Sequence, residues 1–436
     1  MIFLAISDRI LVIILQGVSM DKKIYSIMSK EQQALCMMLS ESLFNNLVVI
    51  DNNVDWKNLL RESKSQSVTP IVFGNLHYLD SIIQVPEEIK AEINKAVETK
   101  VMQNIRVRHS HGYLHKLMSD AGIKYCILKG VASAHYYSQP ILRNMGDVDF
   151  YVDRKDVDAV KHLLFDEGFE LDSDDGGEHG HHMVFRKKGM HLELHFEIAG
   201  IPKGDVGELI RGYCTDIIET ASETTEEYVT YNNPDAFHHG LVMILHMQHH
   251  MTIEGIGLRH LCDWAVFVNS FKNNEFSELF KDKLSSVGLW RFAVIMSIVA
   301  AKLILMPEQR WMGEIEISDD TVEAIAEDIM LGGNFGRKQG SRKYESLTIT
   351  VAGRDGKNKS KIVRMFESLN KIVVGHWPIV RKITFLYPVG WIYFVLRFFI
   401  LLLVGKRNVP DFIGSFKGSD RRSEIYSKLG LFETKE

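Results

Sequence analysis

The chain has 436 residues, of which 46% are hydrophobic and 25% are charged, and its formal net charge is −5. These proportions are those of an ordinary globular protein, and the length allows two or three packed units. The negative charge argues against a protein that binds nucleic acid with its whole surface.

Cysteine usage indicates the redox environment of the chain. Cys36, Cys126, Cys214 and Cys262 lie far apart and form no C-x-x-C pair. This spacing argues against a zinc ribbon and against a disulfide framework, and it favours a reducing compartment. We therefore expect a cytoplasmic protein.

Residues 1–28 form an uncertain leader. Residues 1–16 are apolar apart from Asp8 and Arg9, but no basic region precedes them and no small-residue cleavage site follows them. They therefore fit a signal peptide poorly. Met20 resembles a natural start, so we expect residues 1–19 to come from an upstream start codon; a membrane-attached leader is the alternative.

The remaining chain divides into four predicted regions. Residues 29–118 carry a helical pattern and are predicted to form an N-terminal helical region. Residues 119–200 are expected to form the core, in the order helix, strand, glycine turn, helix, strand, helix and two or three further strands. Residues 201–310 again favour helices, and residues 311–436 form a C-terminal region. The predicted class is α+β, with a small sheet flanked by N-terminal and C-terminal helical regions.

A glycine turn follows the first predicted strand. The apolar run 123–128 has the length of a strand and ends at Lys129 and Gly130, and residues 131–137, which include Ser133, read as the start of a helix. A strand, a glycine turn and a helix N-terminus together bind anions, because free backbone N–H groups and the positive end of the helix dipole face the ligand. Lys129, Gly130 and Ser133 are therefore candidate phosphate contacts.

The segment Asp147-Val148-Asp149 is the most informative in the chain. In an extended strand Asp147 and Asp149 lie on one face, about 7 Å apart. Neighbouring carboxylates repel each other and strands are poor in Asp, so such a pair is usually neutralised by a cation. Hard oxygen ligands suit Mg²⁺ or Mn²⁺ that also binds a substrate phosphate, and Arg143 can reach the same phosphate. The alternative is two exposed turn carboxylates at a strand start.

A third carboxylate is predicted on a later strand. In residues 190–198 apolar residues alternate with polar ones, among them Glu193, His195 and Glu197, which therefore share one face. If this strand pairs beside the strand of Asp149, Glu193 completes a three-carboxylate cluster and Glu197 is the competitor. The alternative is an ordinary amphipathic strand with a solvated face.

Two groups of histidines stand out. His179, His181 and His182 lie in a loop rich in Asp and Gly, where they either contact phosphate or are solvated. His246 and His250 are four residues apart on one helical face, a spacing that zinc sites use. Because no third ligand follows at the expected distance, packing or substrate-cleft roles are favoured over zinc.

Charged residues follow a pattern in the later part of the chain. Arg259 and Asp263 are four residues apart on a predicted helix, where they either pair with each other or face the cleft. Acidic residues concentrate in 314–328 and basic residues in 337–364. The basic stretch is predicted to be an exposed loop; the alternative is a surface that meets an anionic acceptor such as RNA, a nucleotide or a lipid headgroup.

Residues 391–404 are apolar except for Arg397. The segment is shorter than the roughly 20 residues that span a bilayer. We expect a buried C-terminal helix. The alternative is an interfacial helix that makes a peripheral contact with a membrane.

Three motifs together resemble a known family. Leu128-Lys129-Gly130, residues 142–149 and residues 192–196 are similar to the L-K-G, L-R-x-M-G-D-x-D and [D/E]-L-H-W motifs of the uncharacterised nucleotidyltransferase family, within the DNA polymerase β-like superfamily. Residues 255–264 also resemble its helical G-x-R-x-x-x-D segment. The resemblance covers roughly residues 30–400.

The resemblance implies a small mixed β-sheet nucleotidyltransferase core that moves a nucleoside monophosphate from an NTP to a hydroxyl acceptor. Asp147, Asp149 and Glu193 would then be catalytic and would bind Mg²⁺ or Mn²⁺, and Glu193 would also activate the acceptor. Arg143 and His195 would join the glycine turn as nucleotide contacts. The acceptor implied is a small molecule, a sugar, a protein or an RNA.

The chain departs from the pattern of its relatives at two places. The superfamily usually has Gly-Ser at the phosphate turn, whereas Gly130 is followed here by Val131. The third carboxylate is Glu193 where many relatives carry Asp, and Phe196 replaces the usual Trp. The first departure weakens the case for a serine hydroxyl on the triphosphate.

Two other functions are consistent with the same residues. A glycosyltransferase also uses a D-x-D motif to bind Mn²⁺ and a nucleotide sugar, but its fold needs several strands upstream of the motif. Only one strand is predicted between residues 30 and 147. A non-catalytic nucleotide-binding protein on the same fold is the other alternative, and the missing Gly-Ser supports it.

Overall fold

The computed structural model describes residues 22–434 apart from 47–49, 51–52, 76–84, 173–181, 346–362, 364–365, 367–368, 371–372, 375 and 404–408. Residues 1–21 of the predicted leader, His179, His181 and most of the basic stretch lie outside the described residues. Residues 22–28 of that leader are described, and Ile24, Tyr25 and Met28 among them are buried in the core.

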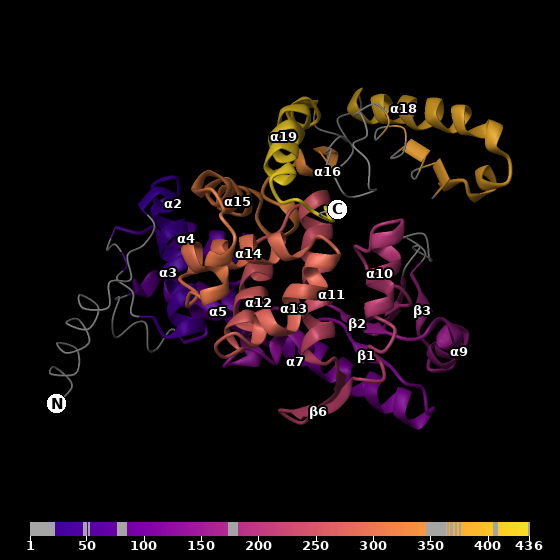
Figure 1. The fold of residues 1–436 in the computed structure, drawn as a ribbon, viewed down its shortest axis with the longest axis horizontal. Coiled ribbons are helices and arrows are strands. Elements are labelled where there is room, and N and C mark those ends of the chain that lie inside the picture. Colours follow the sequence, from indigo (N-terminus) through magenta and orange to yellow (C-terminus); the bar gives the residue numbers. More distant parts are fainter. Residues whose placement is uncertain are drawn as a thin grey trace.

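A mixed sheet positions the candidate site (Figure 1). Its strands are β1 (Cys126–Ile127), β2 (Val148–Tyr151), β3 (Glu170–Leu171), β4 (His182–Lys187) and β5 (Met190–His195). Their order across the sheet is β1-β2-β5-β4-β3. β2 and β5 are parallel, whereas the other neighbouring strands are antiparallel. A separate hairpin consists of β6 (Ser222–Glu226) and β7 (Val229–Asn233).

One face of the sheet is apolar and packs on helices. Phe150 of β2 and Leu192 and Leu194 of β5 are fully buried, because alternate residues of a strand point to the same face. They share a core with apolar residues of α7 (Glu87–Asp120) and α9 (Val157–Asp166). The polar residues of the same two strands therefore face the opposite side.

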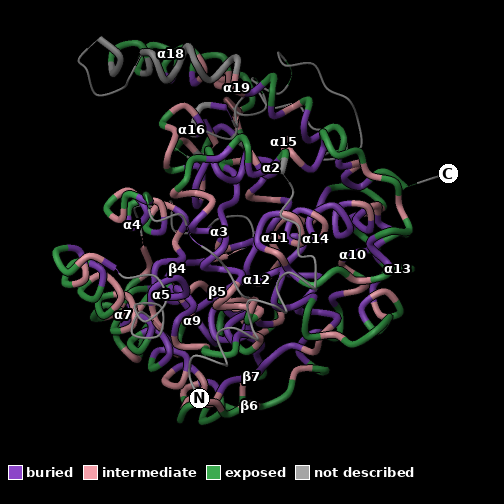
Figure 2. The backbone as a smooth tube through the Cα atoms, turned by 90° about the vertical axis from the view of Figure 1, so that its left-hand side faces the viewer, coloured by how far each residue is buried: buried purple, intermediate pink, exposed green. Residues whose placement is uncertain are grey.

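Helices cover that opposite side. The described helices before α7 are α2 (Lys22–Ser26), α3 (Lys30–Phe44), α4 (Trp56–Ser65) and α5 (Thr69–Phe73). After the hairpin come α11 (Ala236–Ile253), α12 (Leu258–Asn269), α13 (Glu275–Ser286) and α14 (Trp290–Ile304). Apolar residues of both groups form one continuous core, and the buried parts of the chain concentrate around α11, α12 and α14 (Figure 2).

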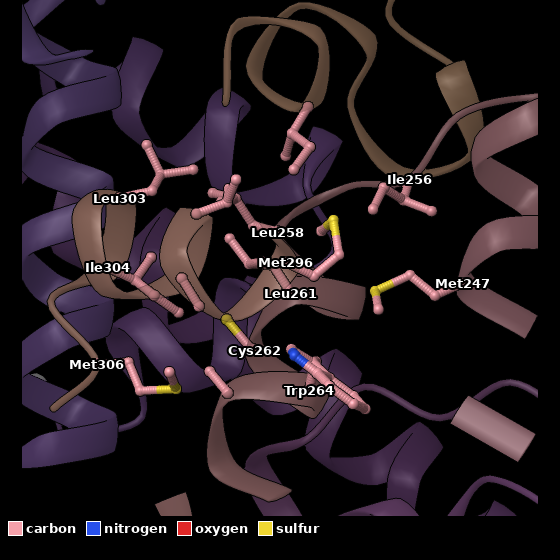
Figure 3. Packing of buried hydrophobic residues seen from close by; sticks show 14 of the residues in the cluster. Met247, Ile256, Leu258, Leu261, Cys262, Trp264, Met296, Leu303, Ile304 and Met306 are labelled. Atoms are coloured by element: carbon pink, nitrogen blue, oxygen red, sulfur yellow. The ribbon is translucent and has the colours of Figure 1, made fainter. Parts of the chain in front are cut away.

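The contact between α12 and α14 shows how this core is packed. Figure 3 shows Leu258 and Leu261 of α12 beside Met296 of α14, with Trp264 below them and Leu303 at the upper left. All five side chains are almost completely buried. This packing holds α12 in place, and α12 carries two charged residues of the site described below.

Short elements connect the larger ones. In the first half of the chain they are α8 (Val131–Ala134), η1 (Pro140–Leu142), η2 (Arg154–Asp156) and α10 (Asp205–Tyr213). The C-terminal region contains η3 (Arg310–Glu314), α15 (Asp319–Gly332), η4 (Asn334–Gly336), α16 (Arg342–Glu345), η5 (Pro378–Arg381), η6 (Thr384–Leu386), α18 (Tyr387–Leu403) and α19 (Val409–Ser427).

The predicted burial of the apolar C-terminal helix is wrong. Figure 1 shows α18 at the edge of the molecule, apart from the sheet and the central helices. Ile392, Leu396, Phe399 and Ile400 each expose more than half of their surface, at 62%, 57%, 53% and 58%. Apolar composition alone does not bury a helix, because burial needs a partner surface. Within the described part of the chain, no helix is long and apolar enough to cross a bilayer.

The predicted fold class is confirmed. The protein is α+β, with a small mixed five-stranded sheet and helical regions on both sides of it in the sequence. The N-terminal helices and the helices of residues 236–304 share one core. The region boundaries drawn from the sequence therefore mark changes in residue pattern along the chain. The N-terminal helices and the helices of residues 236–304 nevertheless pack against each other.

Candidate active site

Neighbouring strands bring the predicted site residues together. In the parallel pair of β2 and β5, Asp149 lies directly opposite Glu193. On the other side of β2, the backbone N–H of Leu128 donates to the carbonyl oxygen of Asp149 at 2.9 Å, so Lys129 follows at the same edge. Because adjacent strands are about 4.8 Å apart, this register places all three charged side chains within reach of one another.

Asp149, Glu193 and His195 form a compact cluster. One ligand atom from each of them lies within 4.8 Å of the others, and within the described residues this is the one such group of three or more. His195 Nε2 lies 3.1 Å from Asp149 Oδ1 and 3.5 Å from Glu193 Oε2. Asp147 precedes the first residue of β2 and lines the same cavity, but it stands outside this cluster.

Lys129 neutralises Asp149. Its Nζ lies 2.6 Å from Asp149 Oδ1, and the Asp149 side chain is only 2% exposed. Burial by itself raises the pKa of Asp149, but the charge of Lys129 and the contact with His195 outweigh it and lower that pKa far below its ordinary value. Burial lowers the pKa of Lys129, but the negative charges of Asp149, Asp147 and Glu193 outweigh burial and raise it. The site therefore holds a carboxylate and an ammonium ion.

Glu193 and His195 both bind protons more tightly than usual. Burial and then the charge of Asp149 raise the pKa of Glu193. Burial lowers the pKa of His195, but its contacts with Asp149 and Glu193 outweigh burial and raise it. The ring of His182 stacks on His195, with centroids 5.1 Å apart, so the histidine loop reaches the site at this residue.

Glu197 lies away from the cluster. β5 ends at His195, and Glu197 pairs with Arg211 at 2.8 Å and with Arg154 at 3.3 Å. It is not among the residues that line the cavity. The alternation predicted for 190–198 is thus present as far as His195, and the strand ends before the second glutamate.

The glycine turn is present, but the helix after it is very short. Gly130 has φ 64° and ψ −117°, and α8 contains only Val131–Ala134. A single turn aligns few peptide dipoles, so the predicted helix-dipole contribution to anion binding is small. Ser133 Oγ lies 3.5 Å from His239 Nε2 and also lines the cavity. Most of the positive charge therefore comes from side chains.

Gly130→Ala should destabilise the protein by about 2 to 4 kcal/mol, because it adds backbone strain to a steric clash. A Cβ at this position would lie 2.6 Å from Nε2 of the buried His111. Gly122 is the matched control: its φ is also 64°, but no atom lies within 4 Å of a Cβ there. Gly122→Ala should therefore cost about 1 kcal/mol. Urea unfolding of both variants measures the difference, and equal losses would contradict the clash.

Arg143 is fixed by Asp263. Its Nε and Nη2 donate to the two carboxylate oxygens of Asp263, each at 2.7 Å, and its Nη1 donates to the carbonyl oxygen of Gly130 at 3.1 Å. Asp263 also accepts from the hydroxyl of Tyr137 at 2.7 Å. Of the two alternatives for Arg259 and Asp263, the structure favours the cleft-facing one, because both residues line the cavity and Asp263 has a bidentate partner from a distant part of the chain.

A cavity of about 580 Å³ lies over the cluster. It is lined by all eight predicted site residues: Lys129, Gly130, Ser133, Arg143, Asp147, Asp149, Glu193 and His195. α11 adds His246 and His250, and α12 adds Arg259 and Asp263. Lys129 Nζ lies 3.3 Å from His246 Nε2, and burial together with the charge of Lys129 lowers the pKa of His246 well below its ordinary value. These histidines line a cleft, one of the two roles that the lack of a third ligand favoured over zinc.

A family model described as uncharacterised nucleotidyltransferase matches residues 52–304. The chain belongs to this nucleotidyltransferase family. The matched segment contains the five-stranded sheet, the glycine turn and α12, and it therefore includes all eight predicted site residues. No curated protein matches the chain. Membership supports nucleotidyl transfer as the activity, with a nucleotide as substrate.

The clustered side chains are compatible with a divalent metal ion. Carboxylate oxygens of Asp149 and Glu193 are hard ligands that suit Mg²⁺ or Mn²⁺, and an imidazole such as that of His195 is acceptable to Mn²⁺. The ion pair between Lys129 and Asp149 shows that this point of the nucleotidyltransferase site already attracts positive charge.

Sequence reasoning missed Asn334 and Phe335, which line the cavity beside Arg337, although all three lie beyond the segment that matches the nucleotidyltransferase family. Arg337 begins the basic stretch, for which contact with an anion was the alternative to an exposed loop. The available signal was the cluster of glycines in Gly332-Gly333-Asn334-Phe335-Gly336, which is typical of a tightly packed loop. Lys100 and Gln103 of α7 also line the cavity and carried no signal of their own.

Proposed function

We propose that this protein transfers a nucleoside monophosphate from an NTP to a hydroxyl acceptor, with Mg²⁺ or Mn²⁺ as the metal. The observation that carries the proposal is the parallel register that sets Asp149 opposite Glu193, with Lys129 bound to Asp149 in the same cavity. A buried and a half-buried carboxylate side by side, next to a lysine, are an expensive arrangement for stability alone, and they match what phosphoryl-group chemistry needs.

Asp149 and Glu193 would hold the metal together with Asp147, which lines the same cavity, and His195 would orient the carboxylates of Asp149 and Glu193. A bound divalent ion would supply charge stabilisation to the phosphate oxygens. Lys129 and the N–H groups that follow Gly130 would contact phosphate, with Ser133 nearby. Arg143 would add positive charge from its fixed position, and it also holds the carbonyl group of Gly130.

In the proposed reaction the acceptor oxygen forms a bond to the α-phosphorus while the bond from that phosphorus to the bridging oxygen breaks. Pyrophosphate leaves, and the proton of the hydroxyl passes to Glu193. Glu193 suits this role by its position, because it lines the cavity directly opposite Asp149 and its carboxylate oxygens can accept the proton. His195 lies 3.5 Å from Glu193 and would keep it in position.

Labelled NTPs test the proposal directly. The full chain is incubated with each NTP in turn and with Mg²⁺ or Mn²⁺, and mass spectrometry is used to look for an added nucleoside monophosphate on the protein or in cell extract. We expect one NTP to label an acceptor and to release pyrophosphate in equal amount. Transfer of a sugar from a nucleotide sugar would select the glycosyltransferase alternative. Nucleotide binding without release of pyrophosphate would select the non-catalytic one.

The described fold disfavours the glycosyltransferase alternative. Such a protein needs several strands before its D-x-D motif, whereas within the described part of residues 30–147 the structure contains β1 alone.

We also propose a cytoplasmic location. The four cysteines are free and buried, which supports it.

We also propose that α18 contacts a lipid surface. Its exposed apolar side chains include Ile392, Leu396, Phe399 and Ile400, and the exposed Arg397 lies among them. A cation within an apolar face suits an anionic membrane, because the face enters the interface while the charge stays at the headgroups. Such a contact would bring the transferase to a membrane-associated acceptor.

Vesicle sedimentation should detect this contact. The full chain should sediment with vesicles that contain phosphatidylserine, and a double variant Leu396→Glu and Phe399→Glu should lower the bound fraction at least about tenfold. Leu209→Glu is the matched control, because Leu209 is also exposed, at 41%, but lies on α10. If the wild type binds no vesicles and instead forms a dimer that the double variant loses, the partner of α18 is a second copy of the chain.

A further inference from the structure

Arg259 is a cation without a carboxylate partner at the α12 side of the cavity. In the described part of the chain no Asp or Glu oxygen lies within 4.0 Å of its guanidinium group, and its Nε is buried without a hydrogen-bond partner. Burial and then the charge of Arg143 lower the pKa of Arg259. A partly buried guanidinium group whose Nε is shielded from water and has no counter-ion is costly, so its environment favours an anionic ligand.

The carboxylate of Asp263 cannot serve Arg259. Asp263 lies one helical turn further along α12, but Arg143 occupies both of its oxygens and Tyr137 donates to one of them. The carboxylate that the sequence suggested as the partner of Arg259 is thus fully used elsewhere. The charge of Arg259 remains directed at the cavity.

An aromatic ring supports Arg259 in place of a carboxylate. The guanidinium carbon of Arg259 lies 5.4 Å from the centroid of the Phe335 ring, and that of Arg337 lies 5.7 Å from it. Such cation–π contacts stabilise a guanidinium group without neutralising its charge. Phe335 therefore holds two arginines at one end of the cavity while both keep their full charge for a ligand.

The loop that carries Phe335 is rigidly anchored. Phe335 has φ 55° and ψ 36°, a left-handed conformation that is rare for a bulky residue and persists only where its surroundings impose it. A Cβ on Gly332 would lie 2.6 Å from the guanidinium carbon of Arg342. Arg342 is itself bound to the buried Asp328 at 2.7 Å. The C-terminal region thus fixes the ring in the cavity.

His260 adds a second buried donor at this end. The backbone N–H of Gly257 donates to His260 Nδ1 at 3.4 Å, and His260 Nε2 has no partner although the residue is only 7% exposed. Burial lowers the pKa of His260 well below its ordinary value, and the charge of Arg259 lowers it further. The ring is therefore neutral, and since Nδ1 accepts, Nε2 carries the proton and can donate to an anion.

We propose that Arg259, Arg337 and His260 form a phosphate-binding subsite, separate from the carboxylate cluster, and that Phe335 is the positioning residue that holds its arginines. The ligand class is a phosphate or polyphosphate group, either the β,γ-tail of the NTP or a phosphate on the acceptor. The identity of the molecule that carries the phosphate rests on the proposed nucleotidyl transfer. The binding of phosphate to the subsite does not require transfer.

Calorimetry with tripolyphosphate in EDTA tests the subsite without metal or transfer. Wild type should bind, and Arg259→Gln should lower the affinity at least about tenfold, because a hydrogen bond to a charged group is lost. Arg154→Gln is the matched control, since Arg154 also lies over a ring, that of Phe196 at 5.0 Å, but pairs with Glu197 outside the cavity. This control should bind as wild type does.

Substitutions of Phe335 test its positioning role. Phe335→Asn removes the ring and keeps a residue that tolerates the left-handed conformation, so the fold should persist while the affinity for tripolyphosphate falls about threefold to tenfold. Phe335→Tyr keeps the ring and should restore wild-type affinity. Phe335→Asn should lower the affinity for tripolyphosphate less in the Arg259→Gln background than in wild type, because the ring acts through Arg259.

Nucleotides distinguish the two sources of phosphate. If the subsite binds the NTP tail, Arg259→Gln weakens ATP–Mg²⁺ binding and leaves AMP binding unchanged. If the subsite binds an acceptor phosphate, Arg259→Gln leaves the affinity for ATP unchanged. Inorganic phosphate then still binds to wild type at saturating ATP, and Arg259→Gln weakens that binding. The proposal is overturned if wild type binds no tripolyphosphate or if Arg259→Gln binds it equally well. If no nucleotidyl transfer is detected but tripolyphosphate binds as expected, the proposed function is contradicted while the phosphate-binding subsite is supported.

Discussion

Asp149→Asn should abolish metal-dependent nucleotide binding and transfer. The side chain is central to the cluster: it lies opposite Glu193, contacts His195 at 3.1 Å and pairs with Lys129 at 2.6 Å. An amide carries no negative charge, so the variant offers a divalent ion one carboxylate fewer at the point where the cluster is most compact. Calorimetric titration with Mg²⁺ and ATP measures the effect, and equal affinity in wild type and variant would exclude the metal site.

The same variant should lower stability. From the sequence, Asp147 and Asp149 look like a repelling pair, so that loss of one charge would be neutral or mildly stabilising. The structure reverses this expectation, because Lys129 and His195 already compensate Asp149. Removing the charge leaves a lysine without its closest anion, which should cost about 1 to 3 kcal/mol. Denaturant unfolding in EDTA measures this loss separately from metal binding.

Glu193→Gln should reduce transfer about 100-fold or more, while Glu197→Gln should be almost silent. Glu193 lines the cavity opposite Asp149, and its loss removes both charge stabilisation and the proposed base. Glu197 pairs with Arg154 and Arg211 outside the cavity. Such a partly exposed pair contributes less than about 1 kcal/mol. The two variants are chemically identical changes four residues apart in the sequence, so each controls for the other.

His195→Ala should fall between these two glutamate variants, with a loss of about 10-fold to 100-fold. Its imidazole contacts both carboxylates of the cluster and orients them. Steady-state transfer rates for the three variants, each checked by circular dichroism, measure the order. An inactive Glu197→Gln beside an active Glu193→Gln would show that the catalytic carboxylate has been misassigned.

Much of the site was predictable because strand periodicity is a local property. Alternation in 190–195 shows which residues share a face, and the spacing of Asp147 and Asp149 does the same for the earlier strand. The family motifs then indicated that these strands belong to one site. The structure brings Asp149 and Glu193 into direct register and adds His195 as the third member of the compact cluster, whereas Asp147 lines the cavity outside it.

The sequence by itself determined the α+β class, the polar face of each strand and the glycine turn, because these depend on neighbours a few residues apart. Tertiary structure alone decided the partners of the charges. Arg143 meets Asp263 across 120 positions, and Phe335 meets Arg259 from beyond the family segment. The exposure of α18 was decided in the same way. The physical reason is that an ion pair, a cation–π contact or the burial of an apolar face depends on which distant surface arrives beside it, and no local pattern records that surface.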